Sequence, residues 1–69
     1  MRNIQVAGRW LRVPYDGPSS SALQVNGVPA MFDRDDEGGW AQVRRPDSPP
    51  RRVSLTVDGA EAGSWRWPG

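Results

Sequence analysis

The chain has 69 residues and a formal net charge of +1, and it combines four tryptophans and nine arginines with no histidine, cysteine or lysine. This composition lacks the usual general base, thiol nucleophile, Schiff-base amine and soft metal ligands, so it argues against an enzyme and against a bound cofactor. No stretch approaches the roughly 20 apolar residues that a membrane-spanning helix needs.

The length is enough for one domain, and we expect residues 1–69 to form a single small β domain. A domain of this size has a marginal core, and small domains often gain stability from disulfides, metals or partners. Disulfides need cysteine and a structural zinc needs cysteine or histidine, and the chain has neither. We therefore expect other protein subunits to supply the stability, in a homo-oligomer or a larger assembly; the alternative is a well-packed monomer. The near-neutral charge does not favour nucleic acid as the partner.

The first half of the chain predicts two hairpins. One joins strands over residues 4–6 and 9–13 through a turn at Ala7-Gly8, and a serine-rich loop follows at 14–21. The second hairpin turns at Asn26-Gly27, the strongest turn signal in the sequence, and joins residues 22–25 to 28–32. Proline at position 29 cannot donate to a ladder, so the returning strand is expected to lie at a sheet edge or to be irregular.

The second half predicts an acidic loop at 33–39, a strand at 40–44 and a proline-rich loop at 46–50. Residues 53–57 alternate apolar and polar side chains, as a strand with one buried face does. A turn at Asp58-Gly59 and a returning strand at 60–67 follow, with Gly63 as a candidate bulge.

Seven prolines and eight glycines are spread over the chain and leave no room for a substantial helix. The fold class predicted is therefore all-β: a small antiparallel barrel or sandwich of five to seven short strands joined by hairpins.

The acidic loop resembles the first half of a calcium-binding loop of the DxDxDG type, because a hard cation takes several oxygen ligands around a glycine turn. Asp33, Asp35 and Glu37 are thus weak calcium candidates. The twelfth position of such a loop is Arg44 and no flanking helix is predicted, so we expect carboxylates facing water and no bound metal.

The aromatic residues have two roles to fill. With one phenylalanine, one isoleucine and three leucines, the chain needs tryptophans in its core, and Trp40 and Trp65 are expected there. Trp67, near the end of the chain, is expected to be exposed. Tryptophan and arginine are both enriched at interface hot spots, and two arginine pairs flank the proline-rich loop. The candidate partner-binding residues are Trp10, Arg44, Arg45, Arg51, Arg52 and Trp67.

The favoured function is a non-enzymatic structural or interaction module that docks on a larger assembly, with no catalytic residues. A phage virion component, such as a capsid decoration, cement or tail accessory protein, is the specific hypothesis, which would place the chain in the virion. One alternative is a carbohydrate-binding module that uses Trp65 and Trp67 as a stacking platform. A second alternative is a nucleic-acid-binding β-barrel, which requires the two arginine pairs to converge on one face.

Overall fold

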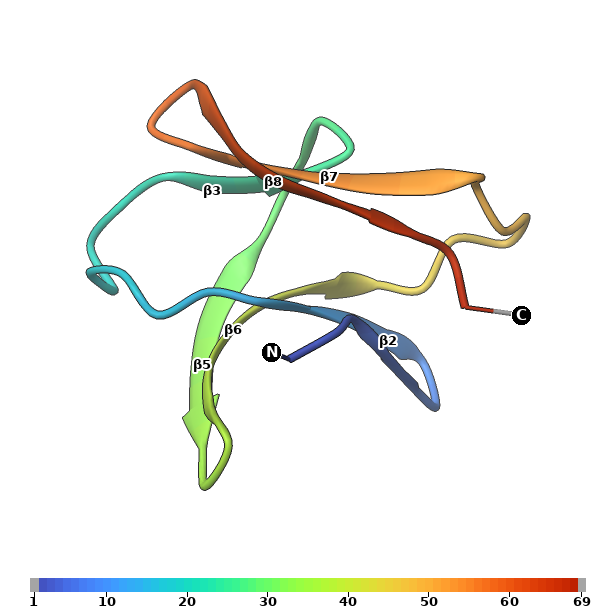
Figure 1. The fold of residues 1–69 in the computed structure, drawn as a ribbon, viewed down its shortest axis with the longest axis horizontal. Coiled ribbons are helices and arrows are strands. Elements are labelled where there is room, and N and C mark those ends of the chain that lie inside the picture. Colours follow the sequence, from blue (N-terminus) through green and yellow to red (C-terminus); the bar gives the residue numbers. More distant parts are fainter. Residues whose placement is uncertain (1, 69) are drawn as a thin grey trace.

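The computed structural model describes residues 2–68 and consists of two antiparallel four-stranded sheets packed as a sandwich (Figure 1). The all-β prediction is confirmed, as a sandwich with eight strands where five to seven were expected. No helix occurs in the described residues, so none could span a membrane. The β6 sheet has the order β1 (Gln5–Ala7), β2 (Trp10–Pro14), β6 (Gly38–Arg44), β5 (Met31–Asp35). The β7 sheet has the order β4 (Val28–Pro29), β3 (Leu23–Val25), β7 (Arg52–Val57), β8 (Ala60–Arg66).

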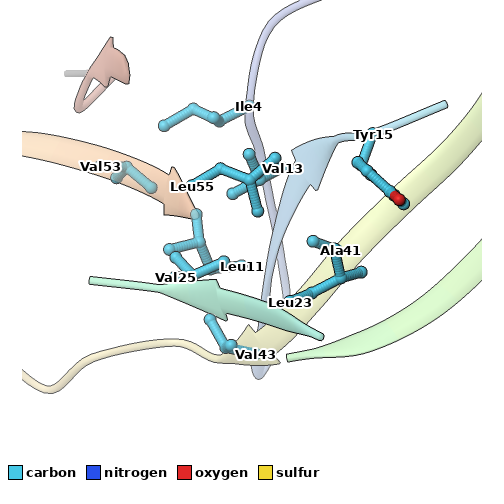
Figure 2. Packing of buried hydrophobic residues seen from close by; sticks show 10 residues of the cluster. All are labelled: Ile4, Leu11, Val13, Tyr15, Leu23, Val25, Ala41, Val43, Val53 and Leu55. Carbon is cyan, nitrogen blue, oxygen red and sulfur yellow. The ribbon is translucent and has the colours of Figure 1, made fainter. Parts of the chain in front are cut away.

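The core lies between the sheets and is built by alternation along the strands. Val53 and Leu55 of β7 are buried while Ser54 between them is half-buried, as the sequence pattern predicted. In the other sheet, Leu11 and Val13 of β2 are buried, and Arg12 between them is half-buried. Ten side chains form the buried cluster (Figure 2): Ile4, Leu11, Val13, Tyr15, Leu23, Val25, Ala41, Val43, Val53 and Leu55.

Two hairpin turns hold the β7 sheet in register. Asn26 and Asp58 adopt positive φ angles of 49° and 51°, each followed by a glycine, which confirms both predicted turns. The Asn26 side chain also donates to the Arg52 carbonyl at 3.2 Å and accepts from the Ser54 N–H at 2.8 Å. The Asp58 carboxylate accepts from the Ala22 N–H at 2.8 Å. Each turn residue therefore ties its hairpin to the neighbouring strand.

The strand that returns from the Asn26-Gly27 turn is irregular and extends beyond the predicted bounds. It was expected over 28–32, at a sheet edge or irregular, and it divides at Ala30 into β4 and β5. Because Pro29 has no N–H to donate, β4 ends there, and β5 begins in the opposite sheet. The Ala30 N–H donates to the Leu23 carbonyl at 2.8 Å at this crossing. The crossing joins the sheets along one side and leaves β1 and β8 as the edge strands on the other.

Three further boundaries differ from the prediction. The first turn lies at Gly8 and Arg9, one residue later than expected. The acidic segment is a hairpin rather than a long loop, since only Asp36 and Glu37 form the turn between β5 and β6. The β8 bulge falls on Ala62, which has no partner on β7, while the adjacent Gly63 pairs with Leu55.

Candidate docking surface

Trp40 is buried, as expected, but not in the core. It alternates with the core residues Ala41 and Val43 along β6, so its ring lies on the outer face of the β6 sheet. The guanidinium groups of Arg2 and Arg12 cover the ring at 4.5 and 4.6 Å from its centroid and leave it 1% exposed. Two cation–π contacts thus take the place of an apolar environment.

Carboxylates balance the two arginines that cover this ring. Arg12 pairs with Asp33 at 3.0 Å and with Asp35 at 3.1 Å, and Arg2 pairs with Asp16 at 2.8 Å. The Gly39 N–H, which donates to Asp16 at 3.0 Å, is the main cause that lowers the pKa of Asp16, and Arg2 adds to it.

The indole N–H of Trp40 is the main cause that lowers the pKa of Asp35. The backbone N–H of Glu37 and the guanidinium group of Arg12 lower it as well. No group in residues 2–68 accepts a hydrogen bond from this indole N–H, so its effect on Asp35 is electrostatic.

The three calcium candidates do not assemble into a metal site. Asp33 and Asp35 lie on strand β5 and engage Arg12, while Glu37 accepts a hydrogen bond from Gln5 at 3.3 Å. Over residues 2–68, no group of three or more acidic side chains lies close enough together to hold a metal ion. The positive charge beside Asp33 and Asp35 is that of Arg12.

Trp67 is less exposed than expected. Trp67 is half-buried and packs against the core cluster, and Trp10 is the more exposed ring at 43%. The backbone N–H of Trp67 donates to the backbone carbonyl of Arg51 at 3.0 Å. This bond continues the β7–β8 ladder past the end of β8 and holds Trp67 in place. Trp65 pairs with the buried Val53 and also packs against the core. The two rings of the expected sugar platform therefore face inward.

The surface around the proline-rich loop at 46–50 is hollowed in several places. We call this region the proline–arginine end; it lies where the loop between β6 and β7 approaches the C-terminus (Figure 1). One open hollow of about 580 Å³ is lined largely by apolar groups: Ile4, Val6, Pro46, Pro49, Trp67 and Pro68. A second, of about 590 Å³, is lined by Pro49, Pro50, Arg51, Arg52, Arg66 and Trp67. The third, of about 230 Å³, is lined by Arg9, Arg44, Arg45, Pro46 and Asp47.

Charge is strongly uneven between this end and the rest of the molecule. Six of the nine arginines line the three hollows, and Asp47 is the one acidic residue among the lining groups. Within residues 2–68, none of these six forms an ion pair, whereas Arg2 and Arg12 do. Arg52 and Arg66 even lie directly opposite each other on β7 and β8, a like-charge pair that destabilises a sheet. A partner that brought carboxylates would relieve this excess of positive charge.

The structure brings the candidate partner-binding residues close together. Five of the six line the hollows, namely Arg44, Arg45, Arg51, Arg52 and Trp67. The sixth, Trp10, lies beside them as the cross-strand partner of Arg44. Sequence reasoning missed Arg66, although its position opposite Arg52 follows from the Asp58-Gly59 turn once the bulge is counted. It also missed Arg9 and Ile4, which reach this end through pairing between strands distant in the sequence.

No protein-family model, curated protein or solved structure matches this chain.

Proposed function

We propose that the chain is a non-enzymatic interaction module that docks through its proline–arginine end onto an acidic surface of a larger protein assembly. The observation that carries the proposal is the set of six arginines that form no ion pair within residues 2–68 and surround hollows lined by proline and tryptophan. Protein interfaces combine an apolar centre with arginine and aromatic anchors in this way. A virion component of a phage is the specific assembly that size and composition favour.

A protein surface fits this end better than a nucleic acid does. The first hollow is lined mainly by Ile4, Val6, prolines and Trp67, which favour apolar side chains, and Asp47 in the same lining would repel phosphates. Trp67 is half-buried and packs against the core cluster, which limits the ring area open to stacking bases. Seven of the eight acidic residues also lie outside the lining groups, where they would repel a long polyanion that extended past this end.

Tryptophan fluorescence during titration with poly-L-glutamate tests the proposal, with an oligothymidylate of equal charge as the comparison. We expect poly-L-glutamate to bind, and Arg51→Glu to weaken binding by about fivefold or more through lost and reversed charge. The matched control is Arg34→Glu on β5, which changes the net charge equally but lies outside the hollows. It should change affinity by less than about twofold.

Two results of this titration would contradict the proposal. Equal losses in the Arg51 and Arg34 variants would mean that total charge alone governs binding. Markedly tighter binding of the oligothymidylate would point to a nucleic acid as the partner.

A further inference from the structure

Strand β8 is a long sheet edge without a covering strand. It has seven residues, and within residues 2–68 it pairs with β7 alone. The other edges are shorter: β1 has three residues, β4 has two, and β5 has five and carries the carboxylates that engage Arg12. Glu61, Ser64 and Arg66 of β8 are exposed. An open edge of this length is a template for pairing with another strand.

The backbone groups that face outward from β8 can be identified from the ladder. The Trp67 N–H bonds to the Arg51 carbonyl, and bonded and non-bonded pairs alternate along an antiparallel ladder. Trp65 and Gly63 therefore bond to β7, while Arg66 and Ser64 direct their N–H and C=O groups outward. The Ser54 carbonyl, opposite Ser64, accepts from Asn26 on the far side of β7, as this alternation requires.

The pairing between the turn and the bulge likewise fixes which backbone groups of β8 face outward there. Val57 and Ala60 flank a two-residue turn and so form a bonded pair, which leaves the backbone of Glu61 facing outward. The outward groups of β8 thus belong to Glu61, Ser64 and Arg66. The side chains of Glu61 and Arg66 both lie on the outer face of the sheet, because each pairs with a residue of β7, Thr56 or Arg52, that alternates with the core positions.

We propose that two copies of this chain pair through their β8 edges, antiparallel about a two-fold axis at Ser64. This register places Ser64 opposite its counterpart and brings Glu61 opposite Arg66 at both ends. The extra residue at Ala62 accounts for the three steps from Glu61 to Ser64 against two from Ser64 to Arg66. Each Arg66, which faces the like charge of Arg52, then gains a carboxylate beside it. The partner is a second copy because the edge is charge-complementary to itself in this orientation.

Sedimentation equilibrium over a range of protein concentrations tests the pairing. The wild-type chain of 7.6 kDa should approach twice that mass as concentration rises. Glu61→Arg and Arg66→Glu should each raise the dissociation constant at least about tenfold, because each sets like charges opposite one another. A mixture of the two variants should restore the dimer, since every contact across that mixed pair joins opposite charges.

A proline at the centre of the edge provides an independent readout. Ser64→Pro removes an outward N–H and leaves the β7–β8 ladder complete, so it should yield a folded monomer by circular dichroism. The matched Ser64→Ala variant keeps the N–H and should still form the dimer. A wild-type chain that stays monomeric at about millimolar concentration would overturn the proposal. So would a dimer that persists in Ser64→Pro, or folded charge variants that fail to pair when mixed. Only Arg66 belongs to both proposed surfaces, and the docking titration relies on Arg51, so the two proposals can fail separately.

Discussion

At the scale of single residues, Trp40 is buried by charged side chains and not by the apolar core. Its ring is covered by two arginine side chains on the outer face of a sheet, and three aspartates hold those arginines in place. From the sequence one can predict that some tryptophans are buried, because the chain has few large aliphatic residues. The sequence does not show that arginines can cover one, because Arg2, Arg12 and Trp40 come from three separate segments.

Replacement of Trp40 should therefore destabilise the fold more than replacement of any exposed ring. Trp40→Ala removes a fully buried ring and both cation–π contacts, and we expect a loss of about 3 kcal/mol in the free energy of unfolding. The matched control is Trp10→Ala, which should cost less than about 1 kcal/mol because the ring is largely exposed. Urea unfolding followed by circular dichroism measures both. Equal losses would contradict a stabilising role for the covered Trp40 ring.

Stability should also decline in acid through Asp16. Hydrogen bonds from Gly39 and Arg2 lower the pKa of Asp16 below its usual 3.8. The unfolded chain therefore takes up this proton first, so the stabilisation is complete above that value and is lost as pH falls through the lower folded pKa. Urea midpoints near pH 6 and near pH 2.5 should differ less in Asp16→Asn than in the wild type. An Asp36→Asn control should show the wild-type difference, and an unchanged difference in Asp16→Asn would refute this account.

At the scale of elements, local signals predicted the β7 sheet well. The Asn26-Gly27 and Asp58-Gly59 turns and the alternation over 53–57 are all encoded within a few residues. The division of the returning strand at Ala30 was not predictable in the same way, because it depends on which sheet each half joins. The extension of β5 and β6 through the acidic segment could not be predicted from local sequence, since the charges of Asp33 and Asp35 are compensated by Arg12 on a different strand.

The side chain of Asn26 links the β3–β4 turn to strand β7. Asn26→Gly keeps a residue that accepts positive φ but removes both side-chain hydrogen bonds to β7. We expect a loss of about 1–2 kcal/mol in the free energy of unfolding. Gly8→Asn is the control, because that turn position has a φ of 59° and open space around it, and it should be nearly neutral. Thermal unfolding of both variants measures the difference, and a stable Asn26→Gly protein would mean that the turn alone sets the register.

At the scale of the whole molecule, the near-neutral total charge hides a strong separation of charge. Composition alone argued against electrostatic recognition, but the fold gathers six arginines at one end and leaves most carboxylates elsewhere. The sequence showed that Arg44, Arg45, Arg51 and Arg52 flank one loop. The contribution of Arg9 and Arg66 depends on strand pairing and appears only in three dimensions. The proposed docking end and the proposed β8 pairing edge would together suit a small component of an assembly.

The most direct test of the docking surface is nuclear magnetic resonance of the nitrogen-15-labelled chain during addition of poly-L-glutamate. The four tryptophan indole N–H groups give separate probes of the two ends of the charge distribution. We predict shifts at the indole signals of Trp67 and Trp10 and at the amides of Arg51 and Arg52, while the Trp40 indole stays unchanged. Shifts of equal size at Trp40 and the β5–β6 turn, or no shifts at the proline–arginine end, would contradict the proposed docking surface.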